Sequence, residues 1–260
     1  MEQKSSKMDK TRSKVAFFSV FCFAVILLFN LRIPDADTKG NIPVDQLRVL
    51  VLTGGHDYDT LYFRNLFDRM PMQVEHVELT KMATFFNSTS DWNYDVIVFY
   101  NFRNRLGNKG KKNFLKLCEQ GVGLVFLHHS LMGFDDWPAF KDIVGARYYF
   151  EGEVPKGKEG TYRHDVTMNV KIHNSGHPIT QGLDDFQLYD EVYGNYWVSE
   201  ENNVLLTTGH PESRPEIGWT RKYEQSRVVF LQPGHGKEAL QDERYARLVR
   251  RAILWAGNQL

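Results

Sequence analysis

The chain alternates between short apolar runs and segments whose apolar residues recur at helical spacing. Four runs have the character of strands in a buried sheet, and they lie at residues 48–53, 73–79, 95–100 and 123–127. Residues 60–69 and 108–119, which lie between these runs, have helical patterns. Near-continuous apolar strands separated by helices are typical of a parallel, doubly wound sheet, and right-handed crossovers then place helices on both of its faces.

The second half of the chain has a different pattern. Residues 165–172 alternate between polar and apolar positions, as a half-buried antiparallel strand does. Further short strands are predicted at residues 187–189, 203–208, 216–220 and 227–232. An amphipathic helix at 241–257 closes the chain. The sequence therefore predicts an α/β fold with a mostly parallel central sheet and an added antiparallel β portion in the C-terminal half.

The N-terminal end carries a separate signal. Residues 1–14 are polar and basic, and residues 15–31 are almost wholly apolar. This pattern is typical of a secretory signal or a signal anchor, and the run is just long enough to span a membrane. No convincing cleavage site follows, which favours an uncleaved anchor at 15–32 with the domain on the extracytoplasmic side; cleavage would instead export the protein. Residues 33–46 resemble a linker, and the domain is predicted at 47–258.

Composition narrows the class of protein. The chain is 42% hydrophobic and 25% charged, which is an ordinary globular balance. Its formal net charge of +0 gives no argument for nucleic-acid binding. The two cysteines, Cys22 and Cys118, lie in the apolar N-terminal run and in a predicted helix. They indicate neither a disulfide framework nor a cysteine-rich metal site.

Three histidines follow predicted strands. His56 comes after 48–53, His128 comes after 123–127, and His235 comes after 227–232. The C-terminal edge of an open α/β sheet is where ligands bind, and imidazole suits proton transfer or metal binding near neutral pH. We expect His128 to face the cleft as the first residue past its strand, and His129 to point elsewhere because strand side chains alternate.

Other candidates are polar residues near these turns. His56 could have a functional role or belong to a plain turn, and the sequence favours neither. For Asp57 and Asp59 we favour a role in capping the next helix. Asp57 is also a candidate for substrate binding. Arg64 and Trp219 are weaker candidates for the same role.

Two carboxylates lie between two tyrosines at Tyr189-Asp190-Glu191-Val192-Tyr193. A carboxylate beside aromatic surface is suited to general acid or base catalysis, and we assign that role to Glu191. Asp190 and Tyr193 are candidates for contacts with sugar hydroxyls. The alternative is a surface acidic pair, which is common.

These pieces together resemble the ThuA-like family, the trehalose-utilisation proteins that share the class I glutamine amidotransferase-like fold. The resemblance spans about residues 47–258 and rests on motifs at residues 54–57, 123–128, 176–180, 190–193, 218–220 and 234–236. It implies a flavodoxin-like, three-layer α/β/α fold and a role in carbohydrate metabolism.

One departure from the related amidotransferases matters for function. They carry a nucleophilic cysteine at the central elbow, where this chain has His128-His129-Ser130. Cys118 lies upstream, in a predicted helix. Without a thiolate at the elbow, glutamine hydrolysis through a thioester is not available, so we do not expect a glutaminase.

Two hypotheses follow. In the first, the chain is an isomerase, lyase or hydrolase that acts by acid–base chemistry on a disaccharide, glycoside or keto-sugar. His128, His235 and Glu191 would surround its cleft, with His56 at the mouth. A variant adds a divalent metal such as zinc, held by two or three histidines and a carboxylate. In the second, the chain is a membrane-tethered carbohydrate-binding or accessory protein without catalysis. The number of histidines favours the enzyme. The expected partners are a small carbohydrate and, through 15–31, a membrane, but no nucleic acid.

Overall fold

The fold is built on one large mixed sheet. We analysed a computed structural model, which describes residues 42–260. The predicted basic segment, the apolar run at 15–31 and most of the linker lie outside the described residues. Within residues 42–260, no helix combines the length and apolar character needed to cross a membrane. The nine strands of the sheet are ordered β2-β1-β3-β4-β11-β10-β9-β6-β7.

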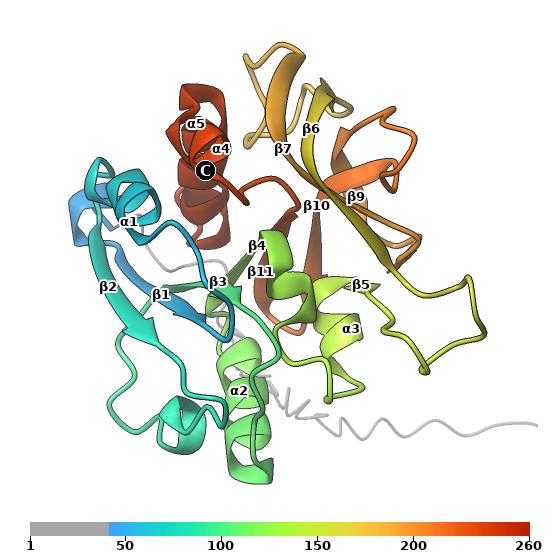
Figure 1. Cartoon of the computed structure of the whole chain (residues 1–260). Helices are drawn as coiled ribbons and strands as arrows, with labels where there is room; N and C mark the ends of the chain where they lie inside the picture. Colours follow the sequence, from blue (N-terminus) through green and yellow to red (C-terminus); the bar gives the residue numbers. More distant parts are fainter. Residues whose placement is uncertain (1–41) are drawn as a thin grey trace, which may run out of the picture. The chain divides into compact units, whose positions relative to one another are not determined.

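Five neighbouring strands form the parallel half of the sheet (Figure 1). Four of them are the predicted parallel strands, and the fifth joins them from the C-terminal half, where the sequence predicts a strand at 227–232. They are β1 (Arg48–Gly54), β2 (Gln73–Glu78), β3 (Val96–Asn101), β4 (Gly123–Leu127) and β11 (Ser226–Leu231). The strands β1, β3 and β4 are buried almost throughout. Their apolar runs reflect this burial, because both faces of a doubly wound sheet are covered.

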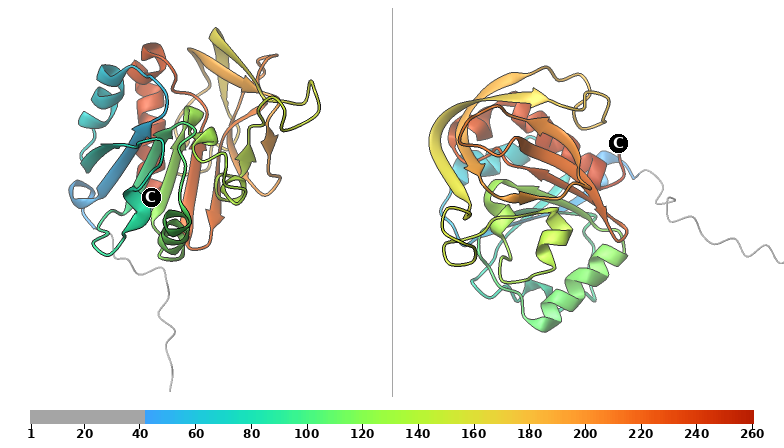
Figure 2. Two further views of the ribbon diagram at one scale, coloured as in Figure 1. Left: turned by 60° about the horizontal axis from the view of Figure 1, so that its bottom comes forward. Right: turned by 90° about the vertical axis from the view of Figure 1, so that its right-hand side faces the viewer.

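The remaining four strands are antiparallel and extend the same sheet. They are β6 (Thr161–Ile172), β7 (Phe186–Gly194), β9 (Asn203–Thr207) and β10 (Glu216–Tyr223). The added antiparallel portion is confirmed, but β7 is much longer than the predicted 187–189. Its polar residues at 190 and 191 interrupt the apolar pattern although they are buried. Figure 2 shows β6 and β7, in yellow and orange, curving over the C-terminal edge of the parallel strands.

Helices cover both faces of the parallel half. One face carries α1 (Thr60–Asp68), α4 (Lys237–Gln241) and α5 (Glu243–Ala256), and the other carries α2 (Asn108–Glu119) and α3 (Phe140–Val144). Alternate residues of β1 enter two separate cores: Val49 and Val51 face the first group, and Leu50 and Leu52 face the second. The predicted three-layer α/β/α architecture is therefore confirmed.

The shorter elements lie in the connections. They are the 3-10 helices η1 (Val44–Gln46), η2 (Phe85–Asn87) and η3 (His128–Met132), and the paired strands β5 (Ala146–Arg147) and β8 (Trp197–Val198). The predicted helix at 241–257 is confirmed as α5, which begins after Asp242, and the carboxylate of this N-cap residue accepts hydrogen bonds from the Arg244 and Tyr245 amides. Asp59 occupies the N-cap position of α1 but makes no side-chain capping bond there, so its predicted cap is not formed.

Stability of the fold depends strongly on the core beneath α2 and α3. Phe126 is fully buried and stacks on Phe99 with ring centroids 4.6 Å apart. We expect Phe126→Ala to lower the free energy of unfolding by about 3–5 kcal/mol, because the truncation leaves a cavity. Urea denaturation measures this, with the exposed Leu61→Ala as the control. A loss below about 1 kcal/mol for Phe126→Ala would contradict the assignment.

Candidate active site

A pocket lined by several histidines lies at the C-terminal edge of the parallel strands, where the antiparallel strands cover them. Its volume is about 320 Å³. Strand ends, β6, β7 and the connections supply its lining residues, which are His56, Phe102, His129, Met132, Tyr148, Phe150, Tyr162, His164, Glu191, Tyr193 and His235. Predicted and unpredicted residues therefore share one cavity at the edge where α/β sheets bind ligands.

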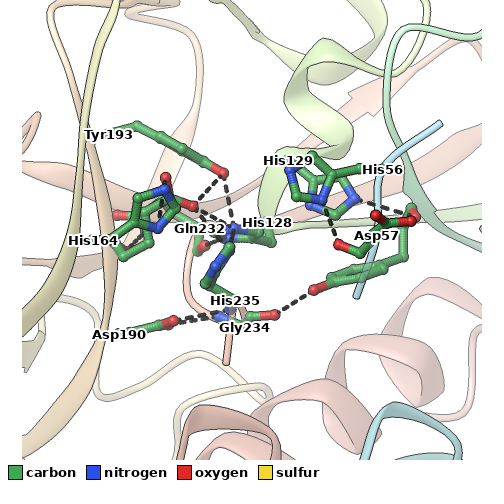
Figure 3. A network of polar contacts seen from close by, with 12 residues as sticks. His56, Asp57, His128, His129, His164, Asp190, Tyr193, Gln232, Gly234 and His235 are labelled. Carbon is green, nitrogen blue, oxygen red and sulfur yellow. Dashed lines mark hydrogen bonds and ion pairs between the residues drawn. The ribbon is translucent and has the colours of Figure 1, made fainter. Parts of the chain in front are cut away.

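Four polar side chains converge beside this pocket. Glu191, Tyr193 and His235 line it, whereas His128 is fully buried and does not line it, so the expectation that His128 faces the cleft is not met. Glu191 Oε2 lies 2.9 Å from His128 Nε2 and 3.1 Å from His235 Nδ1, and these two nitrogens are themselves 3.1 Å apart. The Tyr193 hydroxyl lies 2.8 Å from His128 Nε2 and 3.0 Å from Glu191 Oε2. Figure 3 shows His128, His235 and Tyr193 pointing toward one another from different elements. The structure thus brings together three of the four predicted catalytic residues and one predicted binding residue; the fourth, His56, lies elsewhere in the pocket.

His128 is held by its backbone and by Gln232. It is the first residue past β4 and adopts a left-handed conformation (φ 52°), which is uncommon for a residue with a side chain. Its Nδ1–H donates to the Gln232 carbonyl over 2.8 Å. In the neutral ring, Nε2 then carries the lone pair that faces Glu191 and Tyr193. Such a bond to a backbone carbonyl is typical of histidines that bind metals.

His235 is positioned through its backbone. The carboxylate of Asp190 accepts hydrogen bonds from the Gly234 and His235 amides, at 2.7 and 2.9 Å. The Gly234 carbonyl accepts a third bond, from the Tyr100 hydroxyl at 2.7 Å. Gly234 has φ 126°, and a Cβ there would collide with the Tyr245 hydroxyl, so only glycine fits this turn. The loop that carries His235 is therefore fixed on both sides.

The electrostatics of the cluster favour an ionised Glu191. Burial alone would raise the pKa of Glu191, but hydrogen bonds with His128 and His235 outweigh burial and hold that pKa well below its usual range. The hydrogen bond with Glu191 raises the pKa of His235 above its ordinary value, against the effect of burial. Burial, together with the neighbouring Glu191 charge, raises the pKa of Tyr193, so its hydroxyl stays protonated and donates a hydrogen bond.

The donor set fits a divalent metal ion. His128, Glu191 and His235 offer ligand atoms that all lie within 4.8 Å of one another. The 2.9 Å contact between His128 Nε2 and Glu191 Oε2 brings two lone pairs together, which requires a proton or a cation between them. Two imidazole nitrogens and one carboxylate oxygen form a known set for catalytic zinc, with an open position for water or substrate. Bonds of about 2.0–2.1 Å in a tetrahedron separate ligands by about 3.4 Å, close to the spacings here.

His56 and His129 form a second pair on another side of the pocket. Their rings stack with centroids 5.1 Å apart, and His56 Nδ1 contacts the Asp57 carbonyl. The prediction that His129 points elsewhere is wrong, because β4 ends in a 3-10 turn instead of continuing its alternation. Burial, with the neighbouring His128 and His56, holds the pKa of His129 well below its ordinary value. His129 is thus a neutral side chain of the pocket wall.

His164 was not among the sequence candidates, and a β-bulge explains its position. The register of β6 against β7 shifts between Arg163 and Val166, so that two residues of β6 lie opposite Glu191. Asp165, within this bulge, has φ 59°. The His164 Nδ1 atom lies 3.5 Å from Glu191 Oε1, the oxygen that faces away from His128. Bulges of this kind re-aim a side chain, and no local sequence pattern announces them.

Two predicted binding residues lie away from the pocket. Trp219 has no exposed surface; it stacks on Phe230 at 4.3 Å, and its indole N–H donates to the Val144 carbonyl. Arg64 lies on the exposed side of α1 and does not line the pocket. The expectation that Trp219 and Arg64 contact substrate is therefore corrected: the first is a core residue, and the second belongs to the solvent face of a helix.

Asp57 and Asp190 also differ from their expected roles. Asp57 is exposed and is not a lining residue, and its carbonyl contacts His56. Asp190 is 4% exposed, and its carboxylate is occupied by backbone amides, so it positions the His235 loop and does not face substrate. Neighbouring residues of a strand point to opposite sides, which is why Glu191 and Tyr193 share the cluster and Asp190 does not.

Neither the Ser130 hydroxyl nor the Cys118 thiol is accessible. Ser130 is fully buried, and so is Cys118, which lies in α2. Burial raises the pKa of the Cys118 thiol to about 12. These side chains therefore offer no activated nucleophile to the pocket.

The raised pKa of His235 predicts a pH dependence for the metal-free protein. Protonated His235 stabilises the fold below its unfolded pKa of about 6.5, and that stabilisation is lost as the pH rises through the higher folded pKa. Glu191→Gln removes the charge that raises this pKa. We expect the unfolding free energy of the wild type, measured in urea with EDTA between pH 6 and 9, to fall more steeply with pH than that of Glu191→Gln. Parallel profiles would contradict the ion pair.

Comparisons with known proteins agree with this fold. A model of the ThuA family, described as trehalose utilisation, matches residues 48–256. A ThuA-like protein of Parabacteroides merdae superposes with a TM-score of 0.69 at 18% identity, covering 82% of this chain and 90% of that one. For a ThuA-like protein of Bacteroides uniformis the TM-score is 0.62 at 18% identity, with 81% and 91% covered.

The fold also resembles a more distant structure, PurLQS of Thermotoga maritima, with a TM-score of 0.53 at 13% identity, covering 81% of this chain and 99% of that one. No curated protein matches the chain. The family match covers nearly the whole of the folded domain and includes the strand ends that carry His56, His128 and His235. The chain therefore belongs to the ThuA, or trehalose utilisation, family.

Proposed function

We propose that this protein is an enzyme of carbohydrate metabolism that acts on a disaccharide, glycoside or keto-sugar by metal-assisted acid–base chemistry. The observation that carries the proposal is the convergence of the ligand atoms of His128, His235 and Glu191 within 4.8 Å, beside a pocket that His235 and Glu191 line. A site for sugar binding alone needs aromatic and amide groups, and it has no use for this concentration of imidazole and carboxylate.

His128, His235 and Glu191 would hold the metal. When bound, a divalent metal polarises a carbonyl or hydroxyl oxygen of the substrate and stabilises negative charge that develops there. The Tyr193 hydroxyl, 2.8 Å from His128 Nε2 and 3.0 Å from Glu191 Oε2, donates a hydrogen bond toward the same point. Gln232 and Asp190 orient His128 and the His235 loop, and so keep the donor atoms converged.

The histidines that would not bind the metal, His164 and His56, would then transfer protons. His164 lies on the β6 side of the pocket, with its ring centroid 4.7 Å from that of His235. His56 lies on the β1 side, 6.3 Å from His235 by the same measure. Both are solvent-exposed, so each can exchange protons with water after accepting one from the substrate. This arrangement suits removal of a proton next to a carbonyl, as in isomerisation or elimination of a keto-sugar.

Metal content tests the ligand assignment. We expect the purified wild-type protein to contain close to one divalent metal ion per chain by elemental analysis, and His128→Ala and His235→Ala to lose most of it. His173→Ala is the matched control, because His173 lies outside the pocket. Equal metal content in all four proteins would contradict the site.

Turnover separates an enzyme from a binding protein. We expect Glu191→Gln to lower kcat/KM for any sugar that the wild type converts by about 10²-fold or more, as the loss of a group essential to acid–base or metal chemistry does. Asp57→Asn is the control, since Asp57 is an exposed carboxylate outside the pocket. Recovery of every bound sugar unchanged from the metal-loaded wild type would instead favour the carbohydrate-binding alternative.

We also propose that residues 15–31 tether the domain to the cell membrane with the domain on the extracytoplasmic side. The support is the basic flank at 1–14 followed by the apolar run. The full chain should then stay in the membrane fraction after an alkaline wash. Protease added from outside should digest the domain once the outer envelope is opened, without lysis of the cells. A domain found only in the lysed interior would contradict the tether, and a shortened, washable chain would indicate cleavage and export.

A further inference from the structure

One wall of the pocket differs in chemistry from the polar cluster. It consists of Phe102, Met132, Tyr148 and Phe150, which we call the aromatic wall. Phe102 follows β3, Met132 ends η3, and Tyr148 and Phe150 belong to the connection between β5 and β6. Phe102 and Phe150 meet edge to face with centroids 6.5 Å apart, and Tyr148 and Phe150 lie 5.2 Å apart. Side chains from three connections thus form one apolar surface.

The Phe150 ring makes a cation–π contact with Arg103. The guanidinium carbon of Arg103 lies 4.1 Å from the centroid of the Phe150 ring. Arg103 has φ 50°, and its side chain pairs with Asp135 over 3.0 Å. Since a cation covers one face of the ring, Phe150 is held in place while it lines the pocket. The ring is therefore presented as a rigid binding surface.

The aromatic wall itself offers one side-chain hydrogen-bonding group, the Tyr148 hydroxyl. Across the described residues that line the whole pocket, the polar side chains are histidines, tyrosines and Glu191, with no Asn, Gln, Asp, Lys or Arg. The hydroxyls near the aromatic wall belong to Tyr148 and to Tyr162, which is 61% exposed at the rim. A second sugar unit placed here would bury several hydroxyls without partners, and each such group costs about 1–3 kcal/mol.

An aromatic ring meets no such penalty. Aromatic rings pack edge to face or offset against one another, and methionine sulfur adds a favourable contact with a ring. The sugar end of the same molecule would reach Glu191, His164 and His56, where the polar groups of the pocket are concentrated. The two walls therefore match a ligand with one hydroxylated part and one flat apolar part.

We propose that the aromatic wall binds the aglycone of an aryl glycoside, or of its keto derivative, in preference to the second sugar of a disaccharide. This inference rests on the proposed function, because it takes the polar cluster as the place where the sugar reacts. It assigns Phe102 and Phe150 as residues that determine specificity.

Calorimetric titration of the full chain in detergent tests the proposal with four probes: 4-nitrophenyl glucoside, methyl glucoside, trehalose and 4-nitrophenol. We expect the aryl glucoside to bind about tenfold or more tightly than methyl glucoside or trehalose, as the burial of one aromatic ring implies. Phe150→Ala should remove most of this difference and leave methyl glucoside binding unchanged. Tyr189→Ala is the matched control, because Tyr189 is exposed and outside the pocket. Circular dichroism checks that each variant is folded.

The outcomes separate this inference from the proposed function. Equal affinities for the aryl and methyl glucosides, tightest binding of trehalose, or no binding of any probe would overturn the aromatic wall as an aglycone site. Turnover of sugars without aryl preference would leave the proposed function standing and remove the inference. Binding of 4-nitrophenol that depends on Phe150, in a protein that converts no sugar, would support the wall as an aromatic-binding site and contradict the proposed function.

Discussion

A buried carboxylate is the constraint on which the site depends. Glu191 is 4% exposed, and a charge removed from water is stable only when other groups compensate it. His128 and His235 supply that compensation at 2.9 and 3.1 Å. Because the three residues come from β7, from the end of β4 and from the loop after β11, the ends of these strands must meet at one point.

The sheet has to curve for this meeting to occur. In the strand order, β11, β10, β9 and β6 separate β4 from β7, yet side chains of Glu191 and His128 touch. The antiparallel half must therefore bend back over the C-terminal edge of the parallel half, as Figure 2 shows. The bulge in β6 and the left-handed residue within it accompany this curvature. One sheet thus supplies both the base of the pocket and its cover.

The turn after β4 sets the direction of the His128 side chain. The resemblance to the class I amidotransferases implies a cysteine nucleophile at this elbow, and this chain has His128 there in a left-handed conformation. The unusual backbone presents the Nε2 atom to a carboxylate and a second imidazole, where a nucleophile would face an acyl group. The same strained turn therefore aims a ligand atom or proton carrier into the site without supplying a nucleophile.

The sequence alone determined four of the five parallel strands, the three longer helices and the histidines at the strand ends, because apolar periodicity reports which local segments are buried. It also identified Glu191 and Tyr193, which share one side of a strand through their spacing of two. Tertiary structure decided the rest. It placed Trp219 in the core and Arg64 in solvent, because a short motif does not report which layer covers it. It brought His164 to Glu191 through a bulge between strands, and Phe150 to the pocket through Arg103. These contacts join residues far apart in the chain, and only the curvature of the sheet sets their distances.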